Sequence, residues 1–152
     1  MELRQRRIGL APAIVLSSTF LMFVVIPAGP SAVIADLGTG VYYVLAMSSL
    51  SVVAILMAGW ASANKYALMG ALRAGGQLIA YELPLVLAVI GVVIQAGTMS
   101  LNGIVLAQNN GSIFGWSGIG FPYILTQFLG FFIFIAAVQA ELTQPPFDMP
   151  VA

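Results

Sequence analysis

The sequence contains no cysteine and no histidine, and it contains few charges. Without thiolates and imidazoles the chain lacks the usual ligands of zinc, haem and iron–sulfur clusters, and it cannot form disulfides. Any redox centre must therefore lie in a partner or be a mobile, lipid-soluble carrier. Charged residues make up 7% of the 152 residues, far below the roughly one quarter of soluble domains. Nothing indicates nucleic-acid binding, because there is no basic run beyond Arg4, Arg6 and Arg7.

Apolar residues dominate the composition. They make up 61% of the chain, and the mean hydropathy is +1.04, which predicts an integral membrane protein. Four apolar stretches are long enough to cross a bilayer, which takes about 20 residues. We therefore expect an all-α, polytopic bundle that forms a single transmembrane domain over residues 1–152. Its helices should cover about 8–26, 41–59, 70–96 and 121–140, with cytoplasmic loops at about 60–69 and 141–152.

The amino-terminal segment has a second interpretation, as a secretory signal peptide. Basic residues precede the apolar run, and the small residues of PAGPSAVIA resemble a cleavage site. The run from Ile8 to Ile26 is long for a signal peptide and long enough for a span. This length favours a membrane helix.

The basic residues predict the orientation. All five fall on one side of the four-helix arrangement, before the first span or between the second and third. The positive-inside rule then makes the amino terminus and the 60–69 connection cytoplasmic. Glu141 and Asp148 are expected at the same membrane face as Lys65 and Arg73.

Glu82 is the most informative charge. If the third helix begins at Tyr66 or Ala67, Glu82 lies about 15 residues along it, or ~23 Å at 1.5 Å per residue. A carboxylate at that depth is costly in a bilayer and marks a candidate functional site. Pro84 removes the N–H that would bond to the carbonyl of Ala80, which predicts a kink and a free acceptor beside Glu82.

Other polar side chains accompany Glu82 on this segment. Arg73, Gln77 and Tyr81 recur at every fourth residue and so form one stripe, which Glu82 adjoins. The glycine pair 75–76 would allow a neighbouring helix to approach closely. Together these residues predict one wall of a polar cavity in which Glu82 exchanges protons.

A structural interpretation of Glu82 remains open. One hydroxyl of the nearby serines could hydrogen-bond to it and merely hold two helices together; the candidates are Ser48, Ser49 and Ser51. Three amides are expected to bond across helices: Gln95, Gln127 and Gln139. Asp36 is expected to cap or order an outer loop.

The segment Glu141–Asp148 forms a second cluster. Its paired prolines cannot continue a helix, so the chain must turn sharply and present both acids near the membrane boundary. From the spacing alone, a solvated loop whose acids face water is the favoured interpretation.

Three motifs connect these segments to a known family. They are ADLGTGVYYVLAMSSL, MAGWASANKYALMGALRAGGQLIAYELPL and AELTQPPFDMPVA, which together cover most of the chain from about Val24 onward. In order and spacing they resemble the NuoH-type membrane subunit of respiratory complex I, NADH-quinone oxidoreductase. The last motif departs mildly from the AETNRAPFD of many members and lacks its basic residue.

The resemblance implies a membrane subunit of a proton-translocating NADH:quinone oxidoreductase in the bacterial inner (plasma) membrane. Such subunits help to form the quinone tunnel for ubiquinone or menaquinone and begin a chain of buried charges. Glu82 and Glu141 would transmit protons or charge, and the matching quinone-site or coupling residues are Lys65, Arg73, Tyr81 and Asp148. NADH, FMN and iron–sulfur clusters would bind only to partner subunits of the membrane arm and the peripheral quinone module.

Two further expectations follow from the resemblance. The chain lacks the family's usual first span and stops before its acidic, glutamate-rich loop, so we expect a fragment of a longer subunit. The main alternative function is a homologous ion-translocating subunit of a membrane-bound hydrogenase or formate hydrogenlyase. A free-standing transporter or channel is disfavoured, because the sequence has no internal pseudo-symmetry.

Overall fold

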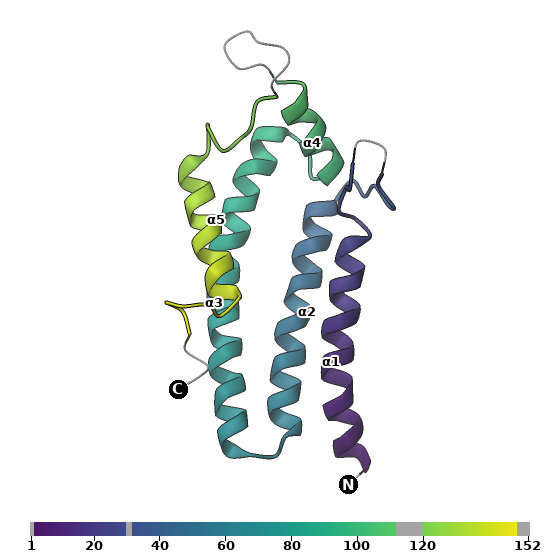
Figure 1. The fold of residues 1–152 in the computed structure, drawn as a ribbon, viewed down its shortest axis with the longest axis vertical. Coiled ribbons are helices and arrows are strands. Elements are labelled where there is room, and N and C mark those ends of the chain that lie inside the picture. Colours follow the sequence, from purple (N-terminus) through teal and green to yellow (C-terminus); the bar gives the residue numbers. More distant parts are fainter. Residues whose placement is uncertain (1, 30–31, 112–119, 149–152) are drawn as a thin grey trace.

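The computed structural model describes residues 2–29, 32–111 and 120–148, in which all regular structure is helical. This confirms the predicted all-α class. In Figure 1 the long helices lie side by side, a short helix lies at one end, and the last helix lies against one of the long ones. The five helices are α1 (Glu2–Phe23), α2 (Gly40–Ala61), α3 (Lys65–Ala96), α4 (Leu101–Asn109) and α5 (Phe128–Glu141).

Two of these helices are long and apolar enough to cross a membrane: α2 with 22 residues and α3 with 32. At 1.5 Å per residue they are ~33 and ~48 Å long, whereas a hydrocarbon core is ~30 Å thick. Both lie close to their predicted ranges. α1 has 22 residues and an apolar part from Gly9 to Phe23, so it matches the first predicted helix.

The fourth predicted helix differs most from the structure. α5 begins at Phe128 rather than Phe121, because residues 123–126 form a turn and the Gln127 side chain bonds to α3 instead of continuing a helix from Phe121. Its 14 residues extend only ~21 Å, less than a bilayer crossing requires. The sequence analysis also did not anticipate α4, whose first turn is capped by Ser100 through a 3.2 Å bond from the Gly103 N–H.

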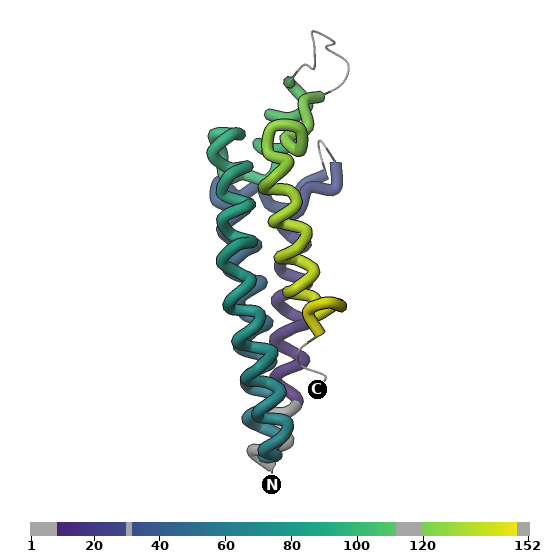
Figure 2. The backbone as a smooth tube through the Cα atoms, turned by 90° about the vertical axis from the view of Figure 1, so that its left-hand side faces the viewer, coloured from purple at the N-terminus to yellow at the C-terminus, as the bar shows by residue number. Residues whose placement is uncertain are grey.

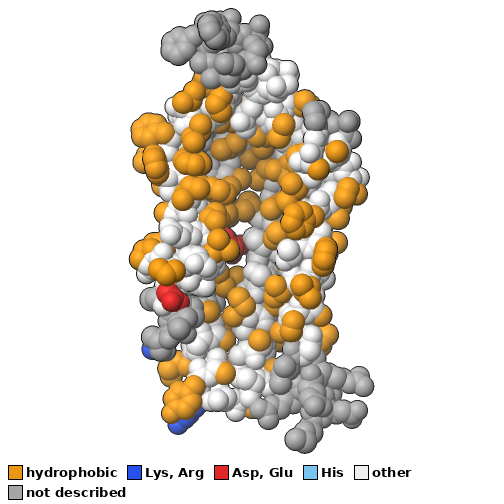
Figure 3. Space-filling model, in the orientation of Figure 1, with side chains coloured by type: hydrophobic (Ala, Val, Ile, Leu, Met, Phe, Trp, Pro, Cys, Tyr) orange, Lys and Arg blue, Asp and Glu red, His pale blue; other side chains and the backbone are white. Residues whose placement is uncertain are grey.

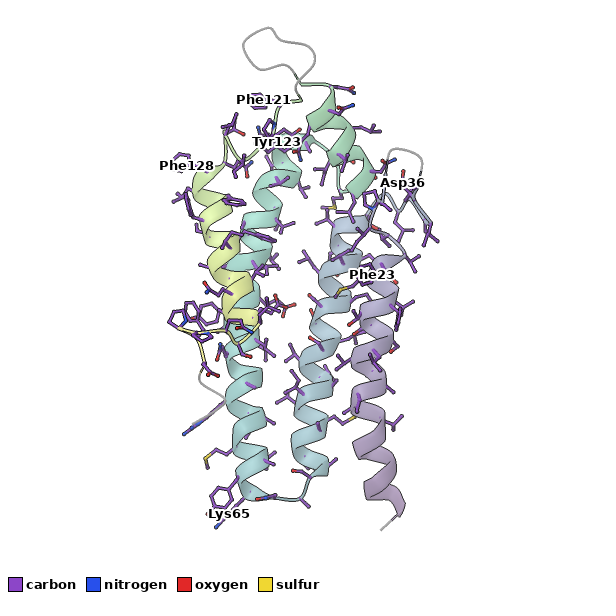
Figure 4. The ribbon with its side chains drawn as sticks, viewed as in Figure 1. Phe23, Asp36, Lys65, Phe121, Tyr123 and Phe128 are labelled. Atoms are coloured by element: carbon purple, nitrogen blue, oxygen red, sulfur yellow. The ribbon has the colours of Figure 1, made fainter. Side chains whose placement is uncertain are left out.

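The helices pack in the spatial order α1, α2, α3, α5, with α4 against the end of α3. Figure 2 shows α5 running alongside α3 and ending well short of the α2–α3 connection. The amino terminus and this connection lie at the same end of the molecule, as the orientation prediction requires (Figure 1). Lys65 is at that end and Asp36 at the other (Figure 4). Thus α3 is the shared neighbour of α2, α4 and α5.

The outer loop before α2 is tied to α4. The Ser100 hydroxyl donates a 2.7 Å hydrogen bond to Asp36 Oδ1. This contact joins residues 64 positions apart and confirms that Asp36 orders the loop before α2.

Large apolar side chains cover the outside of the helices, as the space-filling view in Figure 3 shows. Phe20, Trp60 and Ile94 are each more than 70% exposed. The buried positions are instead rich in small residues, among them Ala54, which is 1% exposed. This distribution suits helices that face lipid or further protein and pack against each other through small side chains.

Two glycines allow α2 and α3 to approach each other closely. A Cβ on Gly59 would lie 2.1 Å from the Cβ of Ala71, and one on Gly75 would lie 2.8 Å from Leu56 Cδ2. A Cβ on Gly76 would meet nothing within 4 Å in the described part of the chain. Of the two glycines predicted to allow a close approach, Gly75 therefore does so within these helices.

We expect Gly59→Ala to weaken the α2–α3 contact, because the added methyl overlaps Ala71 and the backbones must separate. The cost should be about 1–3 kcal/mol, as for other overpacked contacts. Thermal unfolding of the detergent-solubilised chain measures it. Gly76→Ala is the matched control and should stay close to wild type; equal losses in both variants would contradict this account.

Candidate functional site

Glu82 lies in the middle of α3 and faces α2. It is 17 residues beyond Lys65, or ~25 Å along the helix axis. Its carboxylate is half-buried and accepts a hydrogen bond from the hydroxyl of Ser49 on α2. One of the three serines considered from the sequence is thus the partner of Glu82. This geometry fits both the structural and the functional interpretation.

Glu141 brings a second carboxylate to the same region. It is the last residue of α5 and is half-buried. The residue before it, Ala140, is held on α3 by Gln77, five residues from Glu82. In the described part of the chain, neither Lys65 nor Arg73 forms an ion pair that would neutralise these acids. Two half-buried acids are thus placed along the same stretch of α3, one on α3 itself and one on α5.

Gln77 holds the end of α5 against α3. Its side chain is 3% exposed, and Nε2 donates to the carbonyls of Ala140 at 2.9 Å and Phe147 at 2.7 Å. One turn further along α3, the ring of Tyr81 makes an edge-to-face contact with Phe147, with centroids 5.2 Å apart. These contacts place the Glu141–Asp148 segment beside the middle of α3.

This placement differs from the expected position at the membrane face. Gln77 is 12 residues beyond Lys65, so the end of α5 lies ~18 Å along α3 from Lys65. Figure 1 shows the same offset, with α5 ending partway along α3. The difference arises because α5 is short and because the Gln77 amide fixes its end. Residues 149–152 of the predicted loop lie outside the described part of the chain.

The remaining predicted site residues are not gathered around Glu82. Arg73 is exposed, and its offset of nine positions from Glu82 places the two on opposite sides of α3. Lys65 is exposed at the start of α3, with its ammonium 5.1 Å from the Tyr66 ring centroid. Asp148 is exposed and follows Phe147 directly. The predicted polar stripe therefore divides: Gln77 and Tyr81 contact the 141–148 segment, and Arg73 does not.

α3 runs through Pro84 as one helix. Pro84 has no N–H for the carbonyl of Ala80, so this acceptor is released two residues from Glu82. A free carbonyl near a buried carboxylate provides a position at which a water molecule can bind.

A separate amide cluster links α3 to the segment before α5. Gln95 donates to Thr126 at 2.7 Å, and Gln127 donates to Gln95 at 2.9 Å and to the Gly91 carbonyl at 2.6 Å. Two of the predicted cross-helix amides are therefore confirmed. The third, Gln139, donates to the carbonyl of Pro145 in the turn after its own helix.

Two cavities adjoin α3 in the described part of the chain. A cavity of about 350 Å³ near α4 is lined mainly by apolar side chains, with Gln108 and Gln127 as its amides. A shallower one of about 660 Å³ lies between α3 and α5 around Pro84. Neither is lined by Glu82 or Glu141. Residues 2–29, 32–111 and 120–148 contain no group of three acidic or other metal-ligating side chains that could hold a metal ion.

Comparison with known proteins identifies the family of this chain. A family model described as NADH dehydrogenase matches residues 4–152. The chain belongs to the NADH dehydrogenase family. Its relatives in this family include the H subunit of the NADH-quinone oxidoreductase of Dehalococcoides mccartyi strain CBDB1, 44% identical over 140 residues. The corresponding proteins of Bacillus thuringiensis strain Al Hakam and Bacillus anthracis strain CDC 684 are each 43% identical over 143 residues.

These alignments cover 92% of the present chain for the Dehalococcoides protein and 94% for the two Bacillus proteins. They cover only 36% and 40% of those relatives. The chain thus spans well under half the length of these relatives.

The residues around the two acids could be found from sequence only in part. Ser49 could not be distinguished from Ser48 and Ser51 by sequence, because all three are serines on the same part of α2. Phe147 was not singled out, although its carbonyl and ring both contact α3. No spacing rule links it to Gln77, which is 70 residues away.

We expect Ser49→Ala to destabilise the packing of α2 against α3, because the half-buried carboxylate of Glu82 loses its hydrogen-bond donor. The loss should be about 0.5–2 kcal/mol, the range of inter-helix hydrogen bonds in membranes. Unfolding in a denaturing detergent measures it. Ser48→Ala is the control, because that hydroxyl bonds to Leu45 on its own helix. An equal cost in Ser48→Ala would contradict the assignment.

Proposed function

We propose that this chain is part of the membrane subunit of a proton-translocating NADH:quinone oxidoreductase. In this role Glu82 and Glu141 pass charge between the quinone reaction and the proton path. The observation that carries the proposal is the placement of two half-buried carboxylates along the same stretch of α3: Glu82 on α3 itself, and Glu141 at the end of α5, which Gln77 holds against α3. Carboxylates within apolar helices commonly act as proton-relay groups, because burial and a like charge nearby both favour the uptake of a proton.

The quinone-facing wall in this proposal is the side of α3 that carries Tyr81. Its ring packs on Phe147, so it stands beside the segment that ends in the exposed Asp148. Arg73 is exposed on the same segment of α3. These residues supply hydrogen-bond donors and charge near an apolar path, which suits a quinone with a polar head and an apolar tail. Lys65 marks the cytoplasmic end of α3.

The chain itself is assigned no redox centre. It has no cysteine or histidine. In the proposed assembly, NADH, FMN and iron–sulfur clusters belong to the peripheral subunits, and the quinone is the substrate that reaches this chain. Its partners are the neighbouring membrane-arm subunits and the peripheral quinone module in the bacterial inner membrane.

The first test concerns the whole assembly. A tag on the chromosomal copy of the gene should purify a complex that oxidises NADH in the presence of a quinone, and a quinone-site inhibitor should block this activity. An intact complex that evolves hydrogen and lacks quinone-dependent NADH oxidation would contradict the proposal and support the hydrogenase alternative.

The second test separates the two interpretations of Glu82. Glu82→Gln keeps the size of the side chain and an oxygen that can accept the Ser49 hydrogen bond, but it cannot ionise. Proton-coupled turnover should fall by about tenfold or more if Glu82 exchanges protons. If Glu82 only holds the helices together, the variant should work as well as wild type. Turnover and proton pumping in membrane vesicles decide between these outcomes.

Asp36→Asn is the matched control for Glu82→Gln. It makes the same acid-to-amide change at a carboxylate that also accepts a serine hydrogen bond, but in the outer loop. The control should retain wild-type turnover. Equal losses in both variants would indicate a general effect of removing acidic groups and would count against a role for Glu82.

A further inference from the structure

We infer that Gln77 is a positioning residue that sets the location of Glu141 relative to Glu82. The inference rests on the proposed function, since it concerns the same pair of carboxylates. Gln77 itself touches neither substrate nor cofactor in this account; it acts through the end of α5.

Gln77 hydrogen-bonds to the chain on both sides of one turn. Its Nε2 atom donates to Ala140, the residue before Glu141, and to Phe147, the residue before Asp148. The two carbonyls bracket the turn that contains the paired prolines. A single atom of α3 therefore fixes where α5 stops and where the chain goes next.

The helix geometry relates this contact to Glu82. Gln77 and Glu82 are five residues apart on α3, so they differ by ~7.5 Å along the axis and by ~140° around it. Gln77 thus faces α5 while Glu82 faces α2 and Ser49. Because α3 is one continuous helix, it holds these two contacts at a constant offset. Loss of the Gln77 bonds removes the side-chain hydrogen bonds from α3 to the turn that carries Glu141.

The chemistry of the amide supports a specific role over simple packing. Gln77 Oε1 is buried and has no hydrogen-bond partner within the described residues. Burying an unpaired carbonyl oxygen is unfavourable, and an apolar side chain of similar size would avoid that cost. What the amide adds is the pair of bonds from Nε2, which leucine cannot make.

The test is a double-mutant cycle in the native membrane assembly. Gln77→Leu should lower proton-coupled turnover by about tenfold while the amount of assembled complex stays near wild type. In a Glu141→Gln background the same Gln77→Leu change should cost less than about twofold, because there is no longer an ionisable group at position 141 to position. Gln77→Asn, which retains a shorter amide, serves in the cycle if the leucine variant does not assemble.

Gln95→Leu is the matched control, since it removes a hydrogen-bonding amide from the same helix at the cluster with Thr126 and Gln127. It should change turnover by less than about twofold in either background. An equal fall caused by Gln77→Leu with and without the Glu141 carboxylate would overturn the inference, because a merely structural role predicts additive losses. A Gln95→Leu loss as large as that of Gln77→Leu would overturn it too. Wild-type turnover in Glu141→Gln alone would instead contradict the proposed function.

Discussion

The hydrogen bond from Ser49 to Glu82 is the interaction around which the described helices are arranged. A carboxylate halfway along an apolar helix needs a hydrogen-bond donor, and Ser49 on the neighbouring helix supplies one. α2 must therefore lie directly against α3, which the small contact between Gly59 and Ala71 allows. The side of α3 that faces away from this bond is then available to α5. One polar contact thus decides which face of α3 each neighbour occupies.

Much of the fold follows from local sequence. The apolar lengths of 41–59 and 70–96 located α2 and α3, because a bilayer sets a minimum helix length that a sequence displays directly. The start of α5 could not be found in this way. Residues 121–127 begin with an apolar stretch that continues into α5 in the sequence, yet residues 123–126 form a turn and the Gln127 side chain bonds to α3. The short helix α4 depends on a single serine cap.

The candidate site was predictable where the physics concerns single residues. Glu82 stood out because an ionised group in an apolar segment is costly wherever the neighbours lie, whereas Glu141 was singled out by the family resemblance. Contacts between residues far apart in the chain were harder to predict from the sequence. A spacing of four linked Arg73 to Gln77 and Tyr81, but it could not show that only the latter two meet the 141–148 segment. The contact between Gln77 and Phe147 spans 70 residues and is set by how α5 docks.

The early end of α5 has a consequence for what can surround this part of the protein. The turn after Glu141 lies ~18 Å along α3 from Lys65, beside the middle of an apolar helix. Residues 144–146 in this turn are exposed. Within a bilayer, lipid offers no hydrogen bonds to an open backbone, so such a turn is stable only where protein covers it or where it lines a water-filled cavity.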